Sequence, residues 1–285
     1  GRVQTPTLAI LARREREIKA FNPTPYAEVH ADFGVAAGEY PGKWIDPAWK
    51  KDEDNPHSRR ERIWDLETAR TIHARCQGRT GTVHEEKKPT RQIAPQLYDL
   101  TTLQREAPFT AKNTLGLAQA LYERHKMLTY PRTDSRHLGH DQLGELPGIL
   151  TAVSFGPYES TVASILDGGS PTLGERFIDD AEVSDHHAII PTAADPARKN
   201  LSADEKRVYD LVVRRFLAAF LPAAVYAAAD LVVEIEVPSE GAEPDRFHAR
   251  GRTRLEAGWQ VIDPPRSKKK EVLLPAVEVG EALPD

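Results

Sequence analysis

The segment at residues 129–135 reads Thr-Tyr-Pro-Arg-Thr-Asp-Ser and places a tyrosine two residues before an arginine. A tyrosine hydroxyl, with a pKa of about 10, is a poor nucleophile unless its phenolate or its transition state is stabilised. Pro131 cannot continue a helix and favours extended backbone at Tyr130, which displays the ring at a turn. Arg132 is then placed to bind the non-bridging oxygens of a phosphodiester as negative charge develops. The spacing predicts nucleophilic attack on phosphorus by Tyr130.

Three polar side chains complete this segment. Asp134 and Ser135 could orient the arginine, and with Thr133 they could hydrogen-bond to a neighbouring nucleotide. The plain alternative is the first turn of a helix, in which Thr133, Asp134 or Ser135 is an ordinary cap. The segment alone leaves both interpretations open.

A second segment, at 184–192, contains the adjacent histidines His186 and His187 and continues as Ala-Ile-Ile-Pro-Thr. An imidazole can donate a hydrogen bond to a phosphate or act as a general acid for a leaving oxygen. Asp185 together with the two histidines could equally supply three metal ligands. A loop-exposed pair without a function is the third interpretation.

A third segment, Gly-Arg-Val-Gln-Thr-Pro-Thr at 1–7, lies just before an expected helix. The free amide hydrogens and the dipole at a helix N-terminus favour anions. Arg2 could bind a phosphate there, and Gln4 could hydrogen-bond to a base edge. A loop end without a ligand is the alternative.

Hydrophobic periodicity and capping patterns predict the elements that position these segments. The key helix runs over 110–125 and leads into Tyr130. The other expected elements are a helix capped by Thr5 before Pro6, strands at 26–33 and 80–86, an excursion from the sheet at 38–56, a helix at 66–75, a polar linker at 87–95, capping boxes at Thr101–Gln104 and Ser202–Glu205, and strands at 231–237 and 247–261. Together these predict an α+β fold, in which a split β-rich domain receives a helical insertion.

Composition favours a folded protein, because 40% of the 285 residues are hydrophobic and 28% are charged. The net charge of −5 does not suggest a nucleic-acid binder. However, residues 1–20 and residues 112–140 each contain five basic residues and only two acidic ones. Cys76, the single cysteine, allows no internal disulfide, which fits a reducing cytosol. The longest apolar stretch, 217–229, is too short and broken to span a membrane.

In order and spacing, the three segments resemble the type IA DNA topoisomerases. The resemblance covers about residues 1–262 and is carried by Gly-Arg-Val-Gln-Thr-Pro-Thr with the helix after it, by Tyr-Pro-Arg-Thr-Asp-Ser and by His-His-Ala-Ile-Ile-Pro-Thr. Pro131, the double histidine, residues 118–123 and the pair Gly258-Trp259 are similar to the topoisomerase III-like branch.

The resemblance implies roles for these residues. Tyr130 would attack one DNA strand, form a 5′-phosphotyrosine and free a 3′-hydroxyl. Arg132 would stabilise the phosphate, and His186 would support that phosphate or the leaving oxygen. Arg2 and Gln4 would contact the strand upstream of the cut. The remaining DNA contacts would come from Thr133, Asp134, Ser135 and His187.

The resemblance also implies a toroidal fold. Residues 1–22 would be a helix of the ring base, 23–91 and 206–265 the β-rich arch, 92–205 the helical domain with the tyrosine, and 266–285 the start of the return toward the base. The phosphotyrosine would keep the bond energy, so resealing after passage of a second strand would need no ATP.

The sequence lacks the N-terminal TOPRIM domain through which the family holds Mg²⁺. We therefore expect no metal bound by this chain itself, and no relaxation of DNA by the chain alone. The resemblance further implies a bacterial, cytoplasmic, DNA-associated protein without a membrane segment. It would be a monomer, and its partner would be mainly single-stranded DNA.

Two other classes of function stay open. Asp185-His186-His187 is similar to the DHH phosphoesterases, which use two metal ions. Those enzymes need further upstream aspartates at strand ends, typically as Asp-x-Asp, and we find no such set in this sequence. The other alternative is a single-stranded DNA-binding module without catalysis, built on basic grooves and aromatic stacking.

Overall fold

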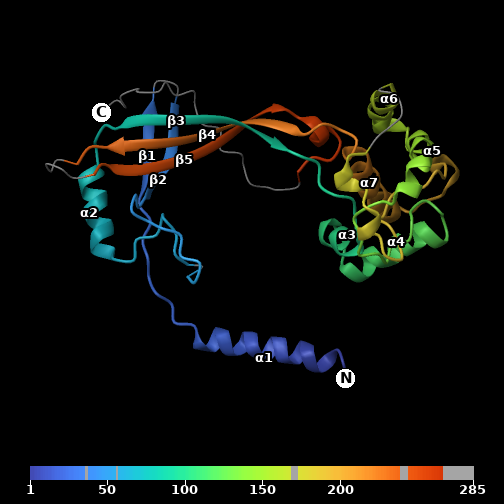
Figure 1. Cartoon of the computed structure of the whole chain (residues 1–285), viewed down its shortest axis with the longest axis horizontal. Helices are drawn as coiled ribbons and strands as arrows, with labels where there is room; N and C mark the ends of the chain where they lie inside the picture. The colour runs from blue at the N-terminus through green and yellow to red at the C-terminus, as the bar shows by residue number, and fades with distance from the viewer. Residues whose placement is uncertain (36–37, 56, 168–172, 238–242, 266–285) are drawn as a thin grey trace. The chain divides into compact units, whose positions relative to one another are not determined.

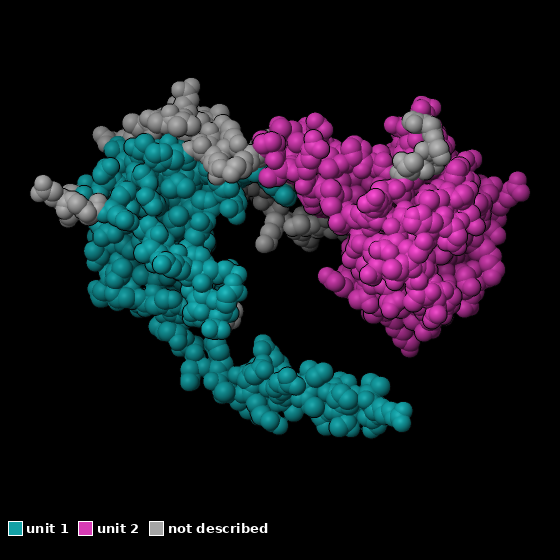
Figure 2. Space-filling model, in the orientation of Figure 1, with its two compact units in different colours: residues 1–87, 228–252, 272–285 teal, residues 88–227, 253–271 magenta. Residues whose placement is uncertain are grey.

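The computed structural model describes residues 1–35, 38–55, 57–167, 173–237 and 243–265. The chain divides into two compact units (Figure 2). Unit 1 comprises residues 1–87, 228–252 and 272–285, and unit 2 comprises residues 88–227 and 253–271. The overall class is α+β, as the sequence predicts.

The described residues contain a five-stranded sheet (Figure 1) with the order β1-β2-β5-β4-β3. Its strands are β1 (His30–Val35), β2 (Gly38–Ile45), β3 (Thr82–Gln92), β4 (Ala224–Ile235) and β5 (Asp245–Glu256). β2 pairs antiparallel with both β1 and β5. The alternation that predicts a strand at 231–237 is confirmed, since Leu231, Val233 and Ile235 all face the core of unit 1.

The expected excursion at 38–56 is wrong for its first eight residues, which form β2. Tyr40 and Trp44 alternate toward the core, with Gly42 between them. A Cβ at position 42 would lie 2.8 Å from the Phe33 ring, so this strand needs glycine there. Pro41 and Gly42 hide the strand pattern, because both residues are depleted in strands. The expected linker at 87–95 is also partly strand, since β3 continues to Gln92.

The helix expected after Thr5 begins earlier and without a side-chain cap. α1 spans Gln4–Ala20 with Val3 at the N-cap position, and the Thr7 hydroxyl donates to the Val3 carbonyl at 2.8 Å. No side chain of α1 is buried, and its apolar residues are exposed, Leu8 at 67%. The other helix of unit 1, α2 (Leu66–Cys76), is capped by Asp65 and packs Ile72 on the sheet.

Unit 2 gathers the helices α3 (Leu100–Glu106), α4 (Ala111–Glu123), α5 (Leu146–Ala152), α6 (Glu159–Asp167) and α7 (Ala203–Ala218), as Figure 1 shows. Short 3₁₀ helices lie between and after them, namely η1 (His140–Glu145), η2 (Gly156–Tyr158), η3 (Glu175–Phe177), η4 (Asp180–Glu182), η5 (Pro196–Arg198) and η6 (Gly258–Val261). The capping box Ser202–Glu205 is confirmed at the beginning of α7. The predicted box at Thr101 is wrong, because the Asp99 side chain caps α3 by accepting from the Thr102 amide.

The predicted boundary at 205/206 lies within the first turn of α7 and assigned the rest of this helix to the arch. The structure instead changes unit at 227/228. The physical reason is packing, since α7 buries Val208, Leu211, Val212 and Phe216 in the helical core. The start of β4 follows α7 in the same unit.

The Gly258-Trp259 pair has a structural role in unit 2. Gly258 has a φ of +49°, and a Cβ there would lie 2.5 Å from the Pro222 carbonyl oxygen. This turn lets the Trp259 amide donate to Pro222 at 2.9 Å, while its indole donates to the Gln92 carbonyl at 2.8 Å. The pair therefore ties the end of α7 to the end of β3.

Candidate active site

The chain reaches Tyr130 through a short extended segment. α4 ends at Glu123, and Lys126 takes a left-handed φ of +58° that turns the backbone away from the helix. Residues 127–129 then run beside 190–192: the Thr129 amide donates to Ile190 and the Thr192 amide donates to Met127, both at 3.0 Å. The two segments that carry the predicted chemistry are thus held side by side by backbone hydrogen bonds.

Tyr130 is half-buried, and its ring lies against two others. The His186 imidazole is nearly stacked on it, with ring centroids 4.1 Å apart and an interplanar angle of 36°. Tyr122 meets the other side edge-on, with centroids 5.5 Å apart. Tyr130 is half-buried and His186 is exposed, and neither belongs to the apolar core of unit 2.

Arg132 is exposed, and in the described part of the chain its guanidinium has no hydrogen bond or ion pair. It follows Pro131, which is buried and anchors the turn. An unpaired guanidinium next to a displayed phenol leaves its donors free for a phosphate. Asp134 is also exposed.

Thr133 and Ser135 differ from the prediction that they contact DNA, because both are buried, at 6% and 4% exposure. The Thr133 hydroxyl donates to the His186 carbonyl at 2.9 Å and accepts from the Ser135 amide at 3.1 Å. These hydroxyls therefore hold the two segments together. The alternative of a helix cap is not found either, since the next helical turn begins only at His140.

His187 makes a polar contact within its own segment. It is half-buried, and its Nδ1 lies 2.8 Å from the Ala188 carbonyl oxygen. Among the described residues, no group of three or more His, Cys, Asp or Glu side chains could hold a metal ion. Asp185, His186 and His187 therefore do not form the ligand set that their sequence suggested.

Arg2 and Gln4 belong to unit 1, whereas the site residues described above belong to unit 2. Arg2 precedes α1, Gln4 is its first residue, and both are exposed. Their placement at a helix N-terminus agrees with the sequence analysis, although the cap differs.

Sequence reasoning missed several residues that support the site. Tyr122, within the helix expected over 110–125, contacts Tyr130, and the Lys126 amine lies 5.4 Å from the Tyr122 ring centroid. The spacing of four residues between Tyr122 and Lys126 was the available signal. His137 was missed too: its carbonyl accepts from the Ala188 amide at 2.9 Å, and its Nε2 lies 2.8 Å from Gln96 Nε2.

Glu205 links α7 to the end of α4. It is 3% exposed and forms an ion pair with Arg124, and its carboxylate lies 3.3 Å from His125 Nε2. Burial alone would raise the pKa of Glu205, but hydrogen bonds from Ser202 and Arg124 outweigh it and lower the pKa to about 2. This carboxylate is therefore charged at neutral pH and fixes the residues that precede Tyr130.

A sequence model of the DNA topoisomerase family matches residues 1–284, and the chain belongs to this family. Within it, the similarity is to the type IA, topoisomerase III-like branch. The chain is 38% identical over 294 residues to DNA topoisomerase 3 of Bacillus subtilis (strain 168), a match that covers 99% of the chain and 38% of that relative. It is 39% identical over 296 residues to DNA topoisomerase 3 of Bacillus cereus (strain ATCC 14579), with the same coverage.

Among solved structures, full-length topoisomerase I from Thermotoga maritima shares the fold, with a TM-score of 0.61 and 22% identity. This match covers 99% of the chain and 43% of that structure. The chain therefore spans well under half the length of the relatives it matches. Neither the DHH phosphoesterases nor a catalytically inactive binding module is favoured by these comparisons.

Proposed function

We propose that this chain carries the strand-cleaving centre of an ATP-independent DNA topoisomerase. The observation that carries the proposal is the contact between the Tyr130 ring and the His186 imidazole, 4.1 Å between centroids, beside an Arg132 without a protein partner. Tyr130 Oη attacks a backbone phosphorus of single-stranded DNA. The Oη–P bond forms, the P–O3′ bond breaks, the phenol gives up its proton and the 3′-oxygen gains one.

In this proposal the neighbouring side chains act on the phosphate. Arg132 binds its non-bridging oxygens and stabilises the added charge of the five-coordinate transition state. His186 lies where it can donate to the same phosphate or to the leaving 3′-oxygen. Arg2 and Gln4 contact the strand upstream of the cut, and Asp134 and His187 lie along its path.

Cleavage stores the bond energy in the 5′-phosphotyrosine, so the 3′-hydroxyl can reverse the reaction after a second strand has passed. The proposal includes Mg²⁺ in the completed enzyme, meaning this chain joined to the regions that its longer relatives have in addition. The described residues contain no cluster that could hold that ion. Relaxation is assigned to the completed enzyme, acting on DNA in the bacterial cytoplasm, and this chain by itself is proposed to be a monomer. No helix of the described residues is long and apolar enough to cross a bilayer.

The proposal is tested by trapping the covalent intermediate in the completed enzyme. An end-labelled single-stranded oligonucleotide is incubated with enzyme and Mg²⁺, and the reaction is stopped with denaturant. We expect a protein–DNA adduct that disappears in Tyr130→Phe. Tyr122→Phe is the matched control, because it keeps the ring that contacts Tyr130 and should keep the adduct. An adduct that persists in Tyr130→Phe contradicts the proposal.

A further inference from the structure

Unit 2 contains a cleft that the proposed chemistry does not use. Its volume is about 920 Å³, and it lies between α5 with η2 on one side and residues 193–201 with α7 on the other. None of its lining residues belongs to the candidate active site. The volume falls within the roughly 300–1,000 Å³ typical of small-molecule sites. Its apolar and aromatic walls include Phe155, Tyr158, Pro196, Leu201 and Tyr209.

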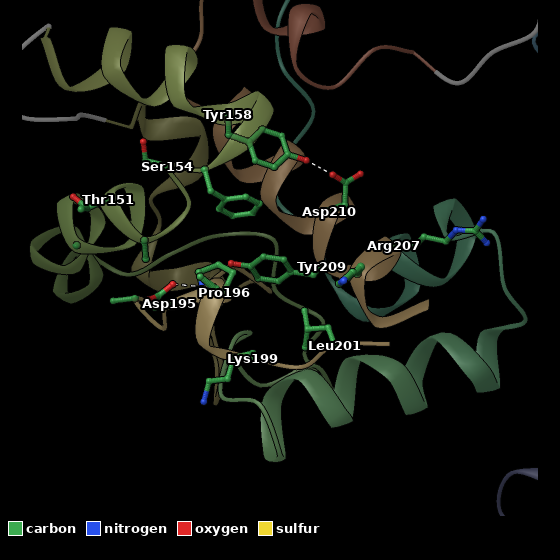
Figure 3. A pocket seen from close by; sticks show the side chains of 16 residues that line it. Thr151, Ser154, Tyr158, Asp195, Pro196, Lys199, Leu201, Arg207, Tyr209 and Asp210 are labelled. Atoms are coloured by element: carbon green, nitrogen blue, oxygen red, sulfur yellow. Dashed lines mark hydrogen bonds between the residues drawn. The ribbon is translucent and has the colours of Figure 1, made fainter. Parts of the chain in front are cut away.

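A buried hydroxyl without a partner lines this cleft. Tyr209 is only 4% exposed, and its hydroxyl has no hydrogen-bond partner in the described residues. Figure 3 shows the ring extending from α7 toward Pro196. Burial raises the pKa of Tyr209, so the hydroxyl keeps its proton and can donate. Leaving such a group unsatisfied is unfavourable, and an acceptor on a ligand would satisfy it.

The neighbouring Tyr158 shows the contrast. Its hydroxyl donates to Asp210, a contact that Figure 3 marks with a dashed line. Its ring meets Phe155 edge-on, with centroids 5.4 Å apart. The cleft thus has two mutually packed aromatic rings on one side and an unsatisfied donor on the other.

The charge that remains at the cleft is positive. Of its two carboxylates, Asp195 pairs with Arg198 at 3.1 Å and Asp210 pairs with Arg214. Lys199 and Lys206 also line the cleft, and neither has an ion pair within the described ranges. An anionic group on a ligand would therefore find cations that the protein has not neutralised.

We propose that this cleft is a binding site for a planar aromatic group that carries an anion, the chemistry of a nucleotide unit. The aromatic group packs between the apolar walls, the Tyr209 hydroxyl donates to one of its acceptors, and Lys199 and Lys206 face the anion. The unit comes either from a free mononucleotide or from a single-stranded DNA segment. The site rests on the cleft's own geometry and does not depend on cleavage at Tyr130.

The test is isothermal titration of the 285-residue chain with thymidine 5′-monophosphate, with uncharged thymidine and oligothymidylate as parallel arms. We expect saturable binding at one site, weakened about 2- to 10-fold by Tyr209→Phe, the loss expected for one hydrogen bond. Lys206→Ala should weaken the binding of thymidine 5′-monophosphate but leave the binding of uncharged thymidine unchanged. The unliganded Tyr209→Phe chain melts no lower than the wild type, because the lost hydroxyl had no partner.

Tyr226→Phe is the matched control, since the Tyr226 hydroxyl is buried and donates to Gln260 at 2.8 Å, away from the cleft. It should leave the dissociation constant unchanged. Binding of oligothymidylate alone, still dependent on the Tyr209 hydroxyl, assigns the site to a DNA strand and supports the proposal. Equal affinities of wild type and Tyr209→Phe, or no saturable binding of either nucleotide probe, overturn it. Tyr130→Phe should bind like wild type, which separates this result from failure of the cleavage proposal.

Discussion

Two arginines of unit 2 have opposite surroundings. Arg215 on α7 is 4% exposed and donates to Asp263 at 2.9 Å, to Glu106 at 2.7 Å and to the Gln96 carbonyl at 3.2 Å. Its guanidinium also lies 4.2 Å from the Tyr98 ring centroid. Arg132 is exposed and has none of these contacts in the described structure. The first satisfies its donors within the fold, whereas the second leaves them for a ligand.

From this difference we infer that the contacts of an arginine side chain indicate whether its role is structural or functional more clearly than the neighbouring residues in the sequence do. Arg215 ties three separate segments together through its hydrogen bonds, and no such contact is found for Arg132 among the described residues. Changing Arg215 should therefore affect folding, and changing Arg132 should affect the reaction. The predictions below test that separation, from the largest expected effect to the smallest.

Arg215→Ala should destabilise the chain by about 3–5 kcal/mol, because it removes a buried guanidinium that donates to the Asp263 carboxylate and to two other segments. Urea unfolding followed by circular dichroism measures this loss. Arg214→Ala is the matched control on the same helix: its partner Asp210 is 43% exposed, so the cost should stay below about 1 kcal/mol. Equal losses for the two variants would contradict the structural role of Arg215.

Arg132→Ala should leave the free energy of unfolding within about 0.5 kcal/mol of wild type, as expected for an exposed side chain without contacts. In the completed enzyme it should slow adduct formation about 10²- to 10³-fold, since one donor to the developing charge is lost. Single-turnover trapping with labelled DNA gives the rate. Arg105→Ala, another exposed arginine of unit 2, removes the same charge and should leave that rate unchanged.

Local patterns were the part of the fold that the sequence could predict. The Ser202–Glu205 capping box depends on residues three apart, and the structure confirms it. Strand β2 was missed because its proline and glycine obscure an alternation that only the partner strands make visible. The predicted domain boundary near residue 205 was misplaced, because the apolar pattern of α7 does not indicate which domain core the helix packs against.

The candidate site divides in the same way. The types and spacing of Tyr130 and Arg132 indicate the chemistry from the sequence alone. Whether His186 meets Tyr130 depends on pairing between segments about 60 residues apart, which no local pattern encodes. The burial of Thr133 and Ser135 follows from the same pairing. Because the sequence does not reveal this pairing, the prediction assigned both side chains to contacts with DNA.

Glu205 connects folding with the position of Tyr130, and its charge gives a pH dependence. Its pKa is lowered to about 2 from an ordinary 4.5, so the stabilisation is fully present above pH 4.5 and is lost as the pH falls toward 2. Glu205→Gln should cost about 1 kcal/mol at pH 7, because the glutamine keeps the capping box but loses the charge. The variant should also lose stability less steeply than wild type between pH 5 and 3.

Urea midpoints measured at several pH values check this. Glu205→Ala should cost more than Glu205→Gln at pH 7, since it removes the capping hydrogen bond as well. Parallel pH curves for wild type and Glu205→Gln would show that the Arg124 pair contributes nothing to the fold.

The last prediction concerns the hydroxyl that joins the two parts of the site. Thr133→Val keeps the side-chain shape but removes the donor to the His186 carbonyl and the acceptor for the Ser135 amide. We expect a loss of about 1 kcal/mol in stability, with Thr133→Ser restoring it. In the completed enzyme, adduct formation should slow while the dissociation constant for single-stranded DNA stays the same, because the hydroxyl positions His186 and does not touch the strand. Weaker DNA binding by Thr133→Val at an unchanged cleavage rate would instead return Thr133 to the DNA-contacting role that the sequence first suggested.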